Sequence, residues 1–134
     1  MDLNDRPDSP RHHPDPGRAV QYFRRAAFVD LLDNQGNTAE GIHIASAGGT
    51  WQTIVCGFGG FRVRNGRMTF KPWLPPDWNA VDFRLKWHGH AMSVSADHTS
   101  ATFTLSGPEG CRETITVNGD EITIQADTTV TVDL

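Results

Sequence analysis

The spacing of hydrophobic residues changes at about residue 61, and this change limits the chain to helices followed by strands. Before that point apolar side chains recur every three or four residues, which is typical of a helix with one packed face. After it they recur every second residue, which is typical of a strand with one buried face. The alternation is clearest at Val81, Phe83, Leu85 and Trp87, which are separated by charged residues. The sequence therefore predicts the α+β class, with two amphipathic helices before a small antiparallel β-sandwich of about six or seven strands.

Two segments carry the helical spacing. The first covers residues 18–32, and turn-forming residues end it at 33–37. The second begins at Thr50, after a loop in which we expect the hydroxyl of Ser46 to cap the helix, and glycines stop it at residues 57–60. The largest apolar side chains of the two segments are Phe23, Phe28, Leu31, Trp51, Ile54 and Phe58. They form more apolar surface than one small sheet covers, so we expect self-association or a catalytic-domain partner through the helices.

Short alternating runs and turn signals divide the rest of the chain. Asn65–Gly66 and Asn118–Gly119 are dipeptides that suit turns between strands, and prolines interrupt regular structure between residue 72 and about Trp78. The first 17 residues hold four prolines and almost no apolar side chain, so they predict a disordered tail. We therefore divide the chain into a tail (1–17), a helical part (18–64) and a C-terminal β-sandwich (65–134). Strands are expected within 67–71, 81–87, 92–94, 101–105, 115–117, 122–124 and 130–132.

Composition argues against several classes of partner. The chain has 134 residues, a formal net charge of -4 and a pI near 5.8, so no basic field attracts nucleic acid or an anionic membrane. No apolar run approaches the ~20 residues that cross a bilayer, and residues 1–15 lack the apolar segment of a secretory signal. Cys56 and Cys111 fit two free thiols in a reducing compartment. We therefore expect a cytoplasmic protein that binds neither nucleic acid nor a membrane.

Five motifs in one order resemble the C-terminal end of glycoside hydrolase family 65, which holds the maltose, trehalose and kojibiose phosphorylases and related hydrolases. The resemblance runs from about Ala19 to beyond Trp87, more than half of the chain. The last strands match only as a pattern. The motifs are Gly41–Ser46, Gly48–Trp51, Gly57–Gly60, Leu74–Trp78 and Phe83–Trp87.

The resemblance implies which parts of a complete family member this sequence corresponds to. Members of the family have an (α/α)-barrel catalytic domain and a small C-terminal β-domain, so residues 19–33 and 50–61 look like late barrel helices and residues 66–134 like the β-domain. The family inverts the anomeric centre: an acid protonates the leaving oxygen while phosphate or an activated water attacks from the opposite face. That general acid would lie upstream of the residues in this sequence. The loop before the last helix would border the attacking side.

In that loop the resemblance leaves two uses open. Glu40 would be the base for water in a hydrolase-like relative. In a phosphorylase-like relative His43 and Ser46, with the N–H groups near Gly48 and Gly49, would hold phosphate. The alternative is structural, with Glu40 as a solvated carboxylate, His43 as a hydrogen-bonding residue and Ser46 as a cap. No cofactor is expected, apart from inorganic phosphate as a co-substrate if the enzyme is a phosphorylase.

Two further sets of residues suggest binding, and each has a structural alternative. Trp73 and Trp78 are candidates for stacking on a sugar, although we favour core or interdomain packing, because the proline-rich loop needs an anchor. His88 and His90, with Asp97 and His98 farther along, suggest a metal site, as does the pair His12–His13, but the ligand spacing is poor. We therefore predict no metal.

Three functions follow from these observations. The first is a C-terminal fragment of a family 65 enzyme that acts on α-glucosidic disaccharides, without turnover by itself, because the two opposed catalytic groups need a complete barrel. The second is a split-enzyme subunit that completes such a site with another chain, with α-glucoside or phosphate as ligand. The third is a sugar- or protein-binding β-module.

Overall fold

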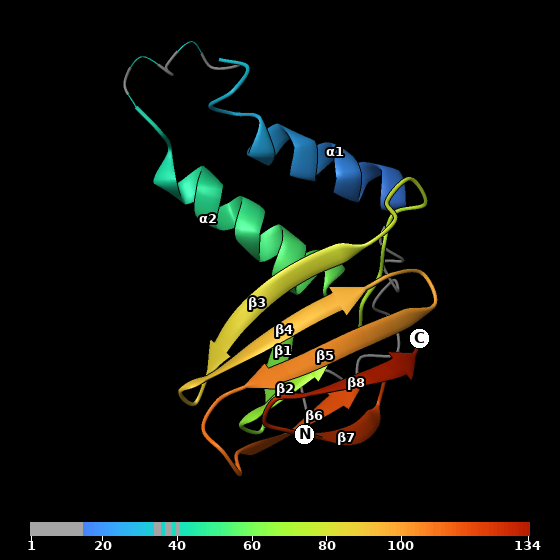
Figure 1. Cartoon of the computed structure of the whole chain (residues 1–134). Helices are drawn as coiled ribbons and strands as arrows, with labels where there is room; N and C mark the ends of the chain where they lie inside the picture. The colour runs from blue at the N-terminus through green and yellow to red at the C-terminus, as the bar shows by residue number, and fades with distance from the viewer. Residues whose placement is uncertain (1–14, 34–35, 37–38, 40) are drawn as a thin grey trace, which may run out of the picture.

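The computed structural model describes residues 15–33, 36, 39 and 41–134. Two helical segments come first and eight strands follow among these residues (Figure 1). The helical elements are α1 (Pro16–Ala27), α2 (Ile44–Gln52) and the π-helical turn η2 (Thr53–Phe58). The strands are β1 (Arg62–Arg64), β2 (Arg67–Phe70), β3 (Val81–Trp87), β4 (His90–Ala96), β5 (Ser100–Ser106), β6 (Arg112–Val117), β7 (Asp120–Gln125) and β8 (Thr128–Asp133). The α+β prediction is confirmed.

The eight strands form two sheets that pack face to face. One sheet has the order β1-β2-β6-β7 and the other β3-β4-β5-β8. Neighbouring strands run antiparallel except β2 and β6, which pair in parallel through Thr69–Thr116 and Phe70–Val117. The predicted small antiparallel sandwich is therefore confirmed, with this one pair of strands as an exception. Strand β1 was not expected, and it already belongs to the first sheet although it lies before residue 65.

The core lies between the inner faces of the two sheets, where the period-two pattern places every second side chain. Met68 and Phe70 of β2 are buried opposite Met92 and Phe103 of the second sheet, and the rings of Phe70 and Phe103 lie 5.0 Å apart. Outer positions carry polar residues, among them pairs of threonines whose hydroxyls bond across strands. The alternation at Val81 and Leu85 also holds, since both are buried.

Three hairpin turns have positive φ angles at both central residues, and two of them are the predicted dipeptides. Asn65 and Gly66 both have positive φ angles between β1 and β2, as do Asn118 and Gly119 between β6 and β7. His88 and Gly89 do the same between β3 and β4. Tight hairpins of this kind match the twist of the strands they connect, which is why these dipeptides fix the register.

The first helix starts earlier and ends earlier than its apolar spacing indicated. Asp15 caps α1, because its carboxylate accepts the backbone N–H of Gly17 at 3.0 Å, and Pro16 occupies the first helical position. This is the cap-and-proline signal of a helix start, within the segment predicted to be a tail. The helix ends at Ala27, and turns continue to Asp33. The remainder of the predicted tail lies outside the described residues.

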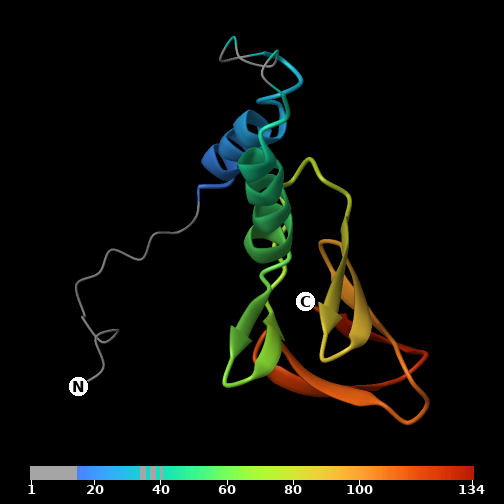
Figure 2. The ribbon, with the colours of Figure 1, turned by 90° about the vertical axis from the view of Figure 1, so that its left-hand side faces the viewer.

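The two helices stand on one end of the sandwich. They run in opposite directions beside each other, and η2 leads directly into the β1–β2 hairpin (Figure 2). Val55 and Phe58 are the buried residues of η2, and Val55 belongs to the core of the sandwich. Among the described residues, no helix has the length and apolar character needed to cross a membrane.

Candidate functional site

The start of α2 is the part of the predicted site that the structure describes in most detail. The helix begins at Ile44, with His43 as the residue before it, and not at Thr50. The run Ile44–Ala47 is rich in alanine, which favours helix, so the helix extends back through the expected loop. The prediction that Ser46 caps the helix was therefore wrong: Ser46 lies inside the first turn, and its backbone N–H donates to the carbonyl of His43 at 2.9 Å.

Asp30 holds His43 at this helix start. The backbone N–H of His43 donates to Oδ2 of Asp30 at 2.9 Å, and its ring Nδ1 is hydrogen-bonded to Oδ1. The hydrogen bond from the His43 side chain is the main reason that the pKa of Asp30 lies below its ordinary value; partial burial opposes this shift. The Asp30 side chain is 21% exposed and that of His43 is 36% exposed, so solvent reaches the pair.

The five predicted ligand and catalytic positions of this loop are brought together only in part. His43 directly precedes α2 and Ser46 lies in its first turn, where helix N–H groups would favour an anion. Gly48 and Gly49 lie farther inside the same helix, so their N–H groups are not at its terminus. Glu40 lies outside the described residues. The roles of Glu40, His43 and Ser46 in catalysis or phosphate binding therefore stay predictions.

The two tryptophans that were candidates for sugar stacking lie in an aromatic cluster. Trp73 stacks on Phe58, with ring centroids 5.6 Å apart and planes at 18°. Trp78 lies 4.6 Å from Phe58 and 5.2 Å from Phe23 of α1. The cluster thus joins the proline-rich loop, η2 and α1. This contact supports the structural alternative for the tryptophans, and sugar stacking stays a prediction.

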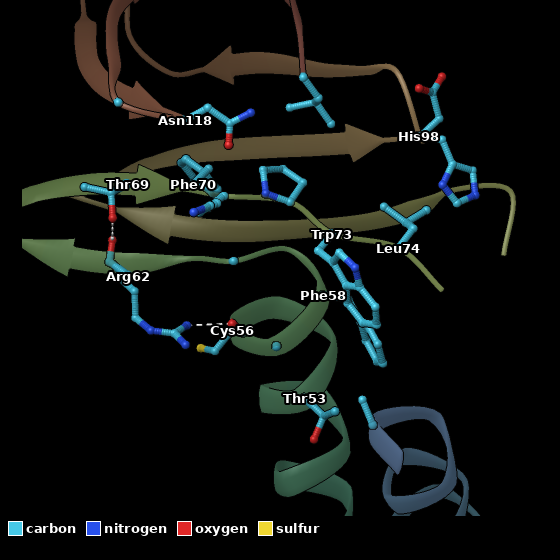
Figure 3. Close-up of a pocket in the computed structure, with 18 of the residues that line it drawn as sticks. Thr53, Cys56, Phe58, Arg62, Thr69, Phe70, Trp73, Leu74, His98 and Asn118 are labelled. Carbon is cyan, nitrogen blue, oxygen red and sulfur yellow. Dashed lines mark hydrogen bonds between the residues drawn. The ribbon is translucent and has the colours of Figure 1, made fainter. Parts of the chain in front are cut away.

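A groove of about 1500 Å³ runs between the base of the helices and the sheets. Figure 3 shows Phe58 and Trp73 on one side of it and Arg62 on another. Arg62 donates to the carbonyls of Cys56 and Phe61, each at 2.6 Å, so its guanidinium fastens β1 to η2. Arg64 and Lys71 also line the groove and make its wall positively charged. Sequence reasoning missed this basic wall, because residues 62–64 were not recognised as a strand.

The residues that suggested a metal site lie in two separate parts of the structure. His98 bonds the carbonyl of Trp78 through Nε2 at 2.7 Å. Asp97 accepts the N–H groups of Thr99 and Ser100, each at 2.7 Å, and these hydrogen bonds lower the pKa of Asp97. In the described part of the chain, no three His, Cys, Asp or Glu side chains are grouped to hold a metal ion. The pair His12–His13 lies outside it.

His88 and His90 instead approach Glu113 on β6. Oε1 of Glu113 lies 3.5 Å from Nδ1 of His88 and 3.9 Å from Nε2 of His90. Sequence reasoning missed Glu113 because its partners lie on a hairpin of the other sheet. It missed Asp30 for a related reason: the residue was assigned to a helix that ends before it. In both cases the missing information was tertiary, and no local pattern carried it.

Comparison with known proteins gives consistent matches. Residues 61–124 match the model of "Glycosyl hydrolase family 65, C-terminal domain". Kojibiose phosphorylase of Thermoanaerobacter brockii is 42% identical over 109 residues, which are 80% of this chain and 14% of that protein. The α,α-trehalose phosphorylase of Geobacillus stearothermophilus is 34% identical over 108 residues, covering 81% of this chain and 13% of that protein.

The same relationship holds in three dimensions. A solved structure assigned as a kojibiose phosphorylase from the human microbiome superposes with a TM-score of 0.76 and 27% identity. The match covers 85% of this chain and 15% of that one. The chain therefore spans about a seventh of the length of the proteins it resembles.

Proposed function

Because the chain belongs to glycoside hydrolase family 65 and corresponds to the C-terminal region of its members, we propose that it is the C-terminal part of a disaccharide phosphorylase. In this role α1 and α2 complete the catalytic domain, the β-sandwich supports them, and the chain has no turnover by itself. Phosphorolysis is favoured over hydrolysis because the similar proteins named for a particular reaction are phosphorylases, whereas those named as glycosyl hydrolases, which cover as much of the chain, are uncharacterised. Inorganic phosphate is then the co-substrate, with kojibiose or trehalose as candidate disaccharides.

The observation that carries the proposal is the exposed apolar surface of the helical part. Ile44 is 78% exposed, Leu31 is 74% exposed and Trp51 is 50% exposed, although the sandwich itself has a closed core. Burying such a side chain contributes roughly 1.5–3 kcal/mol, so this surface favours contact with further helices. The remaining large exposed side chains of this part are Tyr22, Phe28, Leu32 and Ile42.

We further propose that the start of α2 faces the phosphate in the complete enzyme. A helix start offers free N–H groups and roughly half a positive charge, and His43 and Ser46 add polar side chains there. Asp30 fixes the ring of His43, which keeps that side chain in one orientation. Both cysteines are free thiols, which supports the cytoplasm as the compartment of the enzyme.

A hybrid enzyme tests the proposal. The 109 matched residues of the kojibiose phosphorylase of Thermoanaerobacter brockii are replaced by the corresponding residues of this chain. We expect the hybrid to release sugar phosphate from kojibiose, whereas neither the truncated relative nor the 134-residue chain alone does so. Turnover by the isolated chain, lost on Glu40→Gln, would instead show that it carries its own active site.

Variants of the hybrid separate the two candidate mechanisms. For a phosphorylase, His43→Gln or Ser46→Ala lowers kcat/KM for phosphate by at least about tenfold. Glu40→Gln changes kcat/KM for phosphate little. If the attacking group is water, Glu40→Gln abolishes hydrolysis, and His43→Gln and Ser46→Ala have no effect on the rate of hydrolysis. Ser95→Ala, at an exposed position on β4, is the matched control and leaves both activities unchanged.

Activity restored by simply mixing the truncated relative with this chain would favour the split-enzyme alternative, in which two separate chains form one site. A hybrid that folds but has no activity would count against the proposal.

A further inference from the structure

One face of the β1–β2 hairpin carries a cluster of positive charges. In the register of the two strands, Arg62 lies opposite Thr69 and Arg64 lies opposite Arg67. Successive side chains of a strand alternate between its faces, so these four residues share one face, while Met68 is buried on the other. The formal net charge of the whole chain is -4, so this face is opposite in sign to the molecule as a whole.

Two cations at this hairpin lack a partner within the protein. Arg64 and Lys71 are exposed, and both line the groove at the base of the helices. Arg67 forms an ion pair with Glu121. In the part of the chain that the structure describes, the side chains of Arg64 and Lys71 have no such ion pair and no hydrogen bond. Their charges are therefore open to a ligand in the groove.

The other charged or titratable side chains along the groove are engaged by the backbone. Nη1 of Arg62 donates to two carbonyls at 2.6 Å, so its positive charge is held at the groove wall. Asp97 also lines the groove, and its carboxylate accepts two N–H groups of its own turn at 2.7 Å. Nε2 of His98 is bonded to a carbonyl at 2.7 Å. Arg64 and Lys71 thus remain as the cations that an anion would contact.

An aromatic surface adjoins these cations. Lys71 and Trp73 both line the groove, and only Pro72 separates them, so their Cα atoms are at most about 7 Å apart. Trp73 is half-buried, and Phe58 covers one face of its indole at a centroid distance of 5.6 Å (Figure 3). Tyr22 of α1 also lines the groove and is 57% exposed. Aromatic rings of this kind suit the apolar face of a sugar.

We propose that the groove binds a phosphate monoester of a sugar, the class of product that a disaccharide phosphorylase releases. Arg64 and Lys71 hold the phosphate, since a guanidinium donates two parallel hydrogen bonds and an ammonium adds a compact charge. The sugar ring lies against Trp73. Every residue used belongs to this chain, so binding needs no completed barrel. The choice of ligand rests on the proposed function, whereas the charge of the groove does not.

The groove is separate from the start of α2. The helical segment runs from Ile44 to Phe58, and only its last part, from Thr53 onward, lines the groove. With a rise of about 1.5 Å per residue, His43 and Cys56 lie roughly 20 Å apart along the helix. The groove is therefore a second site, which takes up released product and does not hold the reacting phosphate.

Titration calorimetry on the folded 134-residue chain tests the proposal. The probes are glucose 1-phosphate, glucose and inorganic phosphate. We expect glucose 1-phosphate to bind with a Kd of about 1 mM or lower, and the other two at least about tenfold more weakly. Raising the salt concentration from about 0.05 M to about 0.5 M should weaken the binding, because salt screens exposed charges. Equal affinities for glucose 1-phosphate and inorganic phosphate, or no binding of glucose 1-phosphate at about 10 mM, would overturn the proposal.

Variants locate the site. Arg64→Gln combined with Lys71→Gln lowers the affinity for glucose 1-phosphate by at least about tenfold. Arg84→Gln combined with Lys86→Gln, at exposed positions on β3, is the matched control and leaves the affinity unchanged. Thermal melting confirms that each variant is folded. Binding that is lost in His43→Gln but kept in the groove variant would place the ligand at the start of α2 and overturn the proposal.

Binding by the groove and turnover by the hybrid enzyme are measured independently. A hybrid without turnover would count against the proposed function, while calorimetry on the isolated chain would still decide whether the groove binds a sugar phosphate. An active hybrid together with an isolated chain that does not bind glucose 1-phosphate would overturn the groove proposal alone.

Discussion

Asp30 and His43 connect the end of one helix to the start of the next through two hydrogen bonds to a single carboxylate. One oxygen of Asp30 accepts the backbone N–H of His43 at 2.9 Å, and the other is bonded to the imidazole. Asp30 lies in the turns after α1, and His43 directly precedes α2. The geometry of the helix pair, and with it the orientation of a proposed phosphate ligand, therefore depends on one charged group.

This link should weaken in acid. Because the pKa of folded Asp30 lies below its ordinary value of 3.8, its contribution to stability is present above that value and is lost as the pH falls through the folded pKa. The protection factor of the His43 amide against hydrogen exchange should fall over that range. Asp30→Asn should give the low protection factor at every pH. Asp82→Asn, at an exposed position on β3, should leave the exchange unchanged.

Phe58 should be the most costly side chain to shorten at the junction of helices and sandwich. It is 2% exposed and contacts the rings of Phe23, Trp73 and Trp78. Phe58→Ala should lower the free energy of unfolding by about 3–5 kcal/mol, as measured by urea denaturation. Phe28→Ala, at a position that is 40% exposed, should cost less than about 1 kcal/mol. Equal losses would contradict this assignment.

Gly60 should tolerate no side chain. It has a φ angle of 63°, and an added Cβ would lie 2.0 Å from the carbonyl oxygen of Lys71. The obstacle is backbone, so it cannot move aside as a flexible side chain would. Gly60→Ala should therefore destabilise the fold by at least about 3 kcal/mol.

Gly57→Ala is the matched control for this prediction. An added Cβ there would meet only a methyl group of Thr53, at 3.6 Å, inside a helical turn. We expect this variant to be neutral or slightly stabilising, by up to about 1 kcal/mol, in the same denaturation experiment. A tolerated Gly60→Ala would show that the approach of residues 60 and 71 is looser than described.

The isolated chain should self-associate through its helices. Ile44 and Trp51 are 78% and 50% exposed, and wet apolar surface of this kind favours association. Light scattering should show a mass above that of the monomer, and a hydrophobic dye should bind. Ile44→Ser with Trp51→Ser should reduce both signals without lowering the melting temperature, whereas Val63→Ser on β1 should not. A strictly monomeric chain that binds no dye would contradict the prediction.

The sandwich could be predicted well from the sequence because its signals are local. The alternation at Val81–Trp87 predicts which face of the strand is buried, and the dipeptide Asn118–Gly119 predicts a turn. Each signal lies within a few residues. The parallel pairing of β2 with β6 could not be predicted in this way. It joins residues such as Thr69 and Thr116, and the residues near each of them do not indicate which strand will be its neighbour.

The helical part was predicted less accurately, for a different physical reason. Its apolar stripe was read from Trp51 onward, but α2 extends back to Ile44 because alanines sustain a helix without contributing to a stripe. The early start of α1 was predictable in principle, since Asp15 and Pro16 form a standard start signal. The two titratable clusters, Asp30–His43 and Glu113–His90, needed tertiary structure to be seen.

The parallel contact between β2 and β6 also sets an order of events during synthesis. The β1–β2 hairpin emerges early, but its only other neighbour in the sheet lies more than forty residues later, between Arg112 and Val117. Until that stretch leaves the ribosome, the edge of β2 that pairs with β6 stays open and the sheet below the helices is incomplete. Contacts of such long sequence separation form slowly, so folding of this region should be completed only after Val117 has been synthesised.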